Sequence, residues 1–153
     1  MLALGIDTGE TAGFCLMEVD KENPINTKPL ELGQFRHEDF EDWANKYIAD
    51  RDGLELVVIE DYRVYKQYAG RHAGDRLITA RMLGKVESLC ASLGITYIEQ
   101  MADVLPIAQK WTQMKMPKNH AVSHQISALN HVRFYLIKNK MDLSALARER
   151  KKD

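Results

Sequence analysis

Two acidic residues, Asp7 and Glu60, occupy positions from which they could hold a metal ion. Each ends a short and almost entirely apolar run, 2–7 or 54–60, of the kind that forms a buried strand. In an open α/β sheet, ligands bind beyond the carboxyl ends of the strands. If these two strands are neighbours, the carboxylates converge there and favour a hard cation such as Mg²⁺ or Mn²⁺. For either acid alone, a carboxylate that merely faces solvent is the alternative.

The hydrophobic pattern places these acids in a chain that alternates strands with helices. The element order is β-β-β-α-β-α-β-α, with the last helical part divided into a short and a long helix. This order predicts an α/β fold with a five-stranded mixed sheet and helices on both faces. Residues 8–13 are expected to form a Gly/Thr turn, residues 1–139 one domain, and residues 140–153 a basic C-terminal tail. The expected strands are 2–7, 14–19, 30–36, 54–60 and 95–99, and the expected helices are 40–48, 75–93, 104–113 and 119–138.

Composition limits the function classes. The chain has 153 residues, 45% of them hydrophobic and 28% charged, which is typical of one globular domain rather than of disorder. The net charge of −1 excludes a uniformly basic coat for nucleic acid. Cys15 and Cys90 lie in apolar strings and are expected to be buried, reduced thiols. Because we find no membrane-length apolar run and no signal-peptide pattern, we expect no membrane partner and a cytoplasmic location, in the host if the protein is viral.

The near-neutral total conceals a division of charge along the chain. Residues 18–61 carry 13 acidic and 5 basic side chains, residues 62–85 carry 1 and 6, and residues 105–153 carry 3 and 10. The loop at 62–74 alternates aromatic and basic residues, which suits stacking on unpaired bases and pairing with phosphates. A solvated loop and an ordinary helix face are the alternative. The residues expected to contact nucleic acid are Tyr62, Arg63, Tyr65, Lys66, Tyr68, Arg71, Arg76, Lys115 and Lys118.

Three segments resemble a known family. Gly5–Phe14 (GIDTGETAGF) is similar to the opening strand and turn of RuvC-type Holliday junction resolvases, which have an RNase H-like fold. Val57–Asp61 resembles their fourth strand with its second catalytic acid, and Ser127–Leu136 resembles the final helix of phage-type members. The resemblance implies an endonuclease that resolves Holliday junctions or other branched DNA with Mg²⁺ or Mn²⁺, as two ions. Asp7 would bridge both ions and Glu60 would hold one.

The resemblance also implies a homodimer formed through the helix that follows the fourth strand. Met82, Leu83 and Val86, with the small Ala80 and Gly84, would then face the second copy. Packing inside the chain's own core explains the same residues equally well.

The final helix departs from the family pattern. Ser127 stands where an aspartate is expected, and His124 stands one turn earlier. A serine hydroxyl is a poor ligand for Mg²⁺, so either His124 completes the site, or a spare acid such as Asp61 or Asp103 does, or the protein binds branched DNA and cuts it weakly or not at all. His131 is expected to pack or to face phosphate rather than metal. The expected catalytic residues are Asp7, Glu60, His124 and Ser127, and the expected metal ligands are Asp7, Glu60 and His124.

The opening turn permits one further interpretation. Gly5–Thr11 also resembles the first phosphate loop of actin-like phosphotransferases. Those enzymes hold ATP between two RNase H-like halves, and 153 residues supply one half at most. The length therefore favours a nuclease or a DNA-binding module over a kinase.

Overall fold

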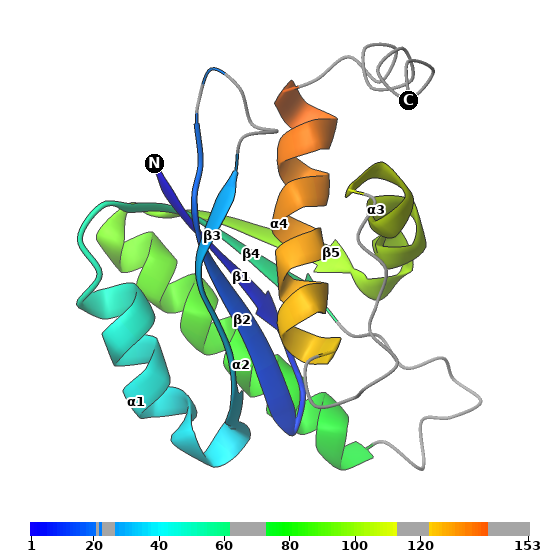
Figure 1. Cartoon of the computed structure of the whole chain (residues 1–153). Helices are drawn as coiled ribbons and strands as arrows, with labels where there is room; N and C mark the ends of the chain where they lie inside the picture. Colours follow the sequence, from blue (N-terminus) through cyan, green and yellow to red (C-terminus); the bar gives the residue numbers. More distant parts are fainter. Residues whose placement is uncertain (21, 23–26, 62–72, 113–122, 141–153) are drawn as a thin grey trace.

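The five strands of this computed structural model form one mixed sheet. The structure describes residues 1–20, 22, 27–61, 73–112 and 123–140. The sheet order is β3-β2-β1-β4-β5. Its strands are β1 (Leu2–Asp7), β2 (Thr11–Glu18), β3 (Lys28–Arg36), β4 (Leu54–Asp61) and β5 (Thr96–Met101). The helices in the described ranges are α1 (Phe40–Ala44), α2 (Ala73–Leu93), α3 (Leu105–Thr112) and α4 (Ser123–Lys140), and a π-helical turn, Asn45–Ala49, continues α1 (Figure 1).

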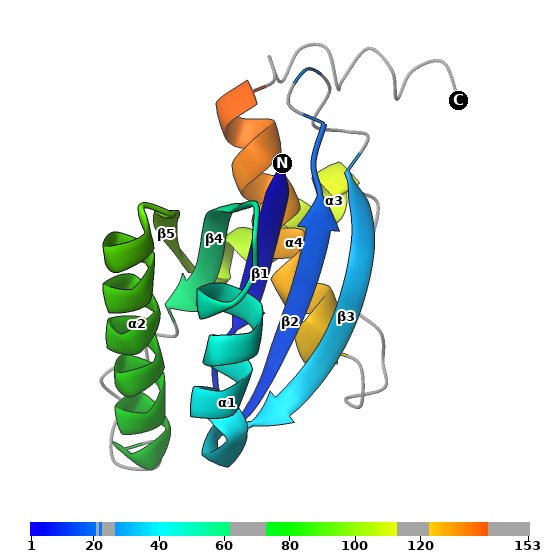
Figure 2. The ribbon, with the colours of Figure 1, turned by 90° about the vertical axis from the view of Figure 1, so that its left-hand side faces the viewer.

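Helices lie on both faces of the sheet, as the sequence predicts. α1 and α2 pack on one face and α4 crosses the other, which Figure 2 shows from the side. β1 is antiparallel to β2 and parallel to β4, so the two strands with terminal acids are neighbours. The predicted α/β fold with a five-stranded mixed sheet is therefore confirmed.

Alternation of side chains along each strand divides the core in two. Leu4 and Ile6 of β1 face α1 and α2, whereas Ala3 faces α4. Gly5 and Asp7 share the side of Ala3 because side chains two residues apart point the same way. The core on this face contains an aromatic cluster at α1, with neighbouring ring centroids 4.3–6.3 Å apart, formed by Phe14, Phe35, Phe40, Trp43 and Tyr47.

Some boundaries differ from the expected ones. β2 begins at Thr11, inside the expected 8–13 turn, because Gly13 pairs with Asp7 in the antiparallel ladder. Met82 and Val86 of α2 are buried in the chain's own core, and Leu83 packs against it. Core packing thus accounts for these three residues without a second copy.

Two further expectations concern the cysteines and membranes. Both cysteines, at positions 15 and 90, are buried free thiols, as expected. Among the helices in the described residues, none is long and apolar enough to span a bilayer.

Two glycines set the distance between α4 and the sheet. A Cβ at Gly13 would lie 2.1 Å from the backbone carbonyl carbon of His124, and a Cβ at Gly5 would lie 2.3 Å from the backbone oxygen of Ala128. No larger residue fits without moving the helix backbone. The absence of side chains at these positions lets α4 lie directly on β1 and β2.

This contact gives a first prediction. Gly13→Ala should lower the free energy of unfolding by about 2 kcal/mol or more, because the added methyl group overlaps helix backbone that cannot turn aside. Urea denaturation measures this change. The matched control is Gly84→Ala, because a Cβ at exposed Gly84 in α2 meets nothing within 4 Å. That change should raise stability by about 0.5–1 kcal/mol through helix propensity, and equal effects of the two substitutions would contradict the close contact.

Candidate functional site

Two buried carboxylates lie side by side on adjacent strands. Asp7 ends β1 and is 7% exposed, and Glu60, one residue before the end of β4, is 5% exposed. The parallel register pairs Ile6 with Ile59, so Asp7 and Glu60 take the next positions along the two strands. Both residues lie on the α4 face, and Figure 1 shows β1 running toward the first turns of that helix. The structure therefore brings together the two acids that the sequence singled out.

The first described turns of α4 contact both acids. His124 Nδ1 lies 3.0 Å from Asp7 Oδ2, and the Ser127 hydroxyl donates a hydrogen bond of 3.2 Å to Glu60 Oε2. Residues three apart share one face of a helix, so one helix supplies a polar group to each acid. The structure thus brings together Asp7, Glu60, His124 and Ser127.

A second histidine, His131, lies one turn beyond Ser127 on α4 and contacts the carboxylate of Glu60. His131 Nε2 lies 2.9 Å from Glu60 Oε2, and Nδ1 lies 3.2 Å from the side-chain oxygen of Gln100 on β5. The His131 side chain is fully buried, so it packs and does not face phosphate. Its spacing of seven residues from His124 is the sequence signal that it shares this helix face. Gln100 carries no such signal, because its position depends on its register opposite Glu60.

Burial and charge perturb the acid–histidine pair. The pKa of Asp7 is raised from 3.8 to about 6. Burial is the largest cause, the hydrogen bond to His124 lowers the pKa, and the nearby Glu60 charge raises it. The same hydrogen bond to Asp7 is the main cause of a raised pKa at His124. Two ionised carboxylates at this depth repel each other, and a cation placed between them would relieve that repulsion.

The donor set fits a hard divalent cation. Carboxylate oxygens are the ligands that Mg²⁺ prefers, and Mg²⁺ is usually held by one or two carboxylates together with water and substrate phosphates. Among the described residues, no group of three or more His, Cys, Asp or Glu side chains is placed to hold a metal ion. Asp7 and Glu60 would therefore be the protein ligands, with His124 in reach of Asp7, and solvent or phosphate would complete the shell.

The other residues expected at the site either lie away from the Asp7–Glu60 pair or lie outside the described residues. Asp61 follows Glu60 directly and points to the opposite face of β4, because side chains alternate. Asp103 lies in the turn after β5 and is exposed. Of the residues expected to contact nucleic acid, only Arg76 falls in a described element, α2, and its side chain is not described. The others, at 62–71, 115 and 118, lie outside the described residues.

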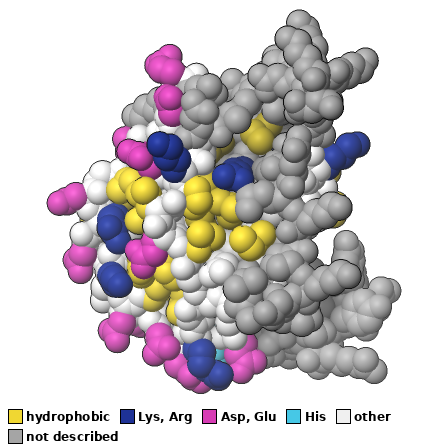
Figure 3. Space-filling view, viewed as in Figure 1, with side chains coloured by type: hydrophobic (Ala, Val, Ile, Leu, Met, Phe, Trp, Pro, Cys, Tyr) yellow, Lys and Arg dark blue, Asp and Glu magenta, His cyan; other side chains and the backbone are white. Residues whose placement is uncertain are grey.

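Surface charge on the described residues is mixed. Figure 3 shows acidic side chains along the left and lower rim of one face, with lysine and arginine among them. Arg36 pairs with Glu38 at 3.1 Å, and Lys85 pairs with Glu41 at 3.1 Å. The acid-rich stretch 18–61 is thus partly neutralised by ion pairs on its own side of the molecule.

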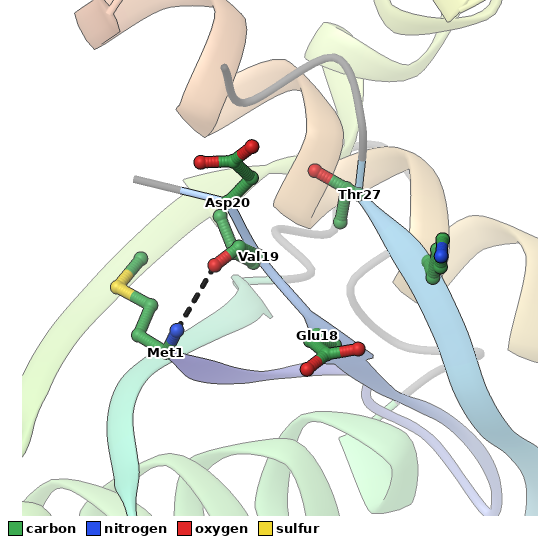
Figure 4. A pocket seen from close by; sticks show the side chains of 6 residues that line it. Met1, Glu18, Val19, Asp20 and Thr27 are labelled. Carbon is green, nitrogen blue, oxygen red and sulfur yellow. Dashed lines mark hydrogen bonds between the residues drawn. The ribbon is translucent and has the colours of Figure 1, made fainter. Parts of the chain in front are cut away.

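A cavity of about 450 Å³ lies at the opposite end of the sheet, where β1 begins and β2 ends. Figure 4 shows the amino group of Met1 donating to the Val19 carbonyl oxygen at 2.9 Å, with the Glu18 and Asp20 side chains lying apart from each other. Thr27 and Lys28 complete the lining. The cavity is remote from the paired carboxylates and contains none of the candidate catalytic residues.

The raised pKa of Asp7 gives a second prediction. The carboxyl group ionises near pH 3.8 when unfolded and near pH 6 when folded, so stability falls as pH rises between these values. Asp7→Asn removes this penalty and should make the metal-free protein about 1–3 kcal/mol more stable at pH 8. The gain should vanish near pH 3, and Mn²⁺ should raise the melting temperature of the wild type only. Thermal unfolding across pH measures this, and a less stable variant at pH 8 would contradict the pKa shift.

Comparisons with known proteins identify the fold. No family model matches the chain, and no curated protein matches it by sequence. Thermus thermophilus RuvC is similar in structure at 13% identity, over 90% of this chain and 97% of RuvC, with a TM-score of 0.56. The fowlpox virus resolvase, in a complex with substrate Holliday junction DNA, is similar at 11% identity over 92% of this chain and 99% of the resolvase, with a TM-score of 0.61. The chain therefore has the fold of RuvC and of the poxvirus Holliday junction resolvases.

Proposed function

We propose that this protein is a divalent-cation-dependent endonuclease that cuts branched DNA, with four-way junctions as its main substrate. The observation that carries the proposal is the pair of buried carboxylates, Asp7 and Glu60, on adjacent parallel strands. A carboxylate pair of this kind has no packing value of its own, because burying two like charges destabilises the fold. Such a pair suits a cation and the phosphate that the cation would hold.

Each residue of the site has a distinct part in this proposal. A bound Mg²⁺ or Mn²⁺ would activate water and neutralise charge on the leaving oxygen. Asp7 and Glu60 would hold the cation, and His124 would orient Asp7 through its 3.0 Å contact or ligate the cation itself. Ser127 orients Glu60 by donating to its carboxylate. Occupation by two ions stays a prediction, because the described ligand set contains two carboxylates.

Branched DNA is proposed as the substrate because of the fold shared with RuvC and the fowlpox resolvase and because of the basic and aromatic residues in the sequence. RuvC and the fowlpox resolvase, whose structures include Holliday junction complexes, share this fold across 90% and 92% of the chain. The aromatic and basic residues of 62–71, with Lys115 and Lys118, are proposed to contact the junction. A homodimer is proposed as well, because two copies related by symmetry would present two sites to opposing strands. The exposed side chains of α2, including Leu77 at 68% exposure, are available for that contact.

Junction cleavage tests the proposal. The wild-type protein with Mn²⁺ should nick a labelled four-way junction, and Asp7→Asn should lower the nicking rate by at least 100-fold because one of the two cation ligands becomes neutral. Gel electrophoresis of the products measures the rate. The control is Asp39→Asn, which removes an exposed acid outside the site and should leave nicking unchanged. Absence of nicking by the wild type on junctions, flaps and RNA–DNA hybrids would refute the enzyme.

A second candidate is a branched-DNA-binding protein whose catalysis is weak or lost. It is favoured by Ser127, a neutral residue where the resemblance leads us to expect an aspartate. The hydroxyl group of Ser127 donates to Glu60, so it adds no negative charge to the cation site. Junction binding that is insensitive to EDTA and to Asp7→Asn, without nicking, is the behaviour that this candidate requires.

Restoring the acid tests, under either candidate, whether position 127 is the site of the missing ligand. Ser127→Asp should raise nicking about tenfold if the wild type is an enzyme, and should create nicking if the wild type only binds. The added charge should also lower the stability of the metal-free protein and enlarge the rise in melting temperature with Mn²⁺. Ser127→Ala is the control, because it removes the hydroxyl without adding charge. If neither nicking nor the Mn²⁺ response increases, position 127 is not the site of the missing ligand.

A further inference from the structure

We propose that His131, held in place by Gln100, is the positioning residue that fixes the Glu60 carboxylate for cation binding. The proposal rests on the cation site described above and assigns a role to two residues outside its ligand set. His131 acts through Glu60 and touches neither cation nor substrate. The bonds among these three side chains join β4, β5 and α4 in the interior of the protein.

The geometry at Glu60 is the first argument. Its Oε2 atom meets Ser127 Oγ at 3.2 Å and His131 Nε2 at 2.9 Å. A glutamate side chain has three rotatable bonds, and a single hydrogen bond leaves the carboxylate free to swing. Two contacts from successive turns of one helix restrict both its position and its rotation. Glu60 thus acquires a defined orientation that its own strand does not impose.

The burial of His131 is the second argument. The ring is fully buried, so it has no access to solvent or to a DNA phosphate. A buried imidazole destabilises the fold unless its nitrogens are satisfied, and both have partners here. An apolar side chain would fill this place in the core without the free-energy cost of burying a polar ring. The polar ring therefore indicates a function in orienting Glu60 rather than in packing alone.

Gln100 is the third member of the arrangement. It lies opposite Glu60 in the β4–β5 ladder, is 9% exposed, and places its side-chain amide 3.2 Å from His131 Nδ1. Because the amide can turn over to present either its oxygen or its nitrogen, it holds the ring in either tautomer. Partners of this kind, one step removed from the cation, commonly change its affinity by 10- to 100-fold.

A pair of substitutions at position 131 tests the role. The amide nitrogen of glutamine can take the place of Nε2 and still donate to Glu60, whereas that of asparagine replaces Nδ1 and reaches only toward Gln100. We expect His131→Asn to weaken Mn²⁺ binding at least tenfold and His131→Gln to stay within about threefold of the wild type. The readout is the Mn²⁺ dissociation constant of the full chain without DNA, from electron paramagnetic resonance and titration calorimetry.

A stability control separates orientation from packing. Leu136→Ala removes buried apolar atoms from the same helix, away from Glu60, and should lower the melting temperature without changing Mn²⁺ affinity. Equal Mn²⁺ affinities for His131→Asn, His131→Gln and the wild type would overturn the role of His131, as would a loss of equal size in both variants.

Mn²⁺ binding by the Asp7→Asn and His131→Asn variants distinguishes a missing cation site from a missing positioning role. If the wild type and Asp7→Asn bind Mn²⁺ equally or not at all, the cation site itself is wrong. If Asp7→Asn abolishes binding and His131→Asn does not weaken it, the site stands and only the positioning role fails.

Discussion

The close contact of α4 with the sheet is the constraint on which the candidate site depends. At Gly5 and Gly13 the helix backbone occupies the space that a Cβ would take. Hydrogen bonds that a nitrogen donates to oxygen are usually about 2.7–3.2 Å long, and the contacts from His124, Ser127 and His131 to the two acids are 2.9–3.2 Å long. A displacement of the helix by the width of one methyl group would break them. Two positions without side chains therefore determine whether the acids have partners.

The polar side chains on the α4 face form a row across the sheet, interrupted at Gly13, which has no side chain. The register places Gln34, Gly13 and Asp7 in line on β3, β2 and β1, and the next positions on β4 and β5 are Glu60 and Gln100. The apolar core beneath α4 lies on one side of this row, and Thr11 and exposed Arg36 lie on the other, so the row is the boundary at which that core ends. Burial raises the pKa of Asp7, and the helix contributes the groups that moderate this effect. The fold thus tolerates a local destabilisation that a purely structural sheet would avoid.

Much of this arrangement could be predicted from sequence, for identifiable reasons. The apolar runs before Asp7 and Glu60 predicted two buried strands, and the element order predicted a mixed sheet with helices on both faces. That the two strands are neighbours was a condition for the carboxylates to converge, and the structure meets it. His124 and Ser127 were found through the resemblance of the final helix to the family pattern, in which acidic residues are expected at these positions. The bond from His131 to Glu60 and the role of Gln100 were not predicted, because periodicity does not specify the register between β4 and β5. The start of β2 was misplaced because glycine and threonine in 8–13 indicate a turn, whereas pairing with β1 extends the strand.

The separation along the chain of the residues that meet has a consequence for biosynthesis. Asp7 and His124 are 117 positions apart, and Glu60 and His131 are 71 apart. A nascent chain emerges from its amino terminus, so the first four strands can associate before α4 leaves the ribosome. Until then the two acids lack their helix partners and the face that α4 covers is open to water. The site is therefore assembled last, and any chain that stops before α4 carries the acids without the means to orient them.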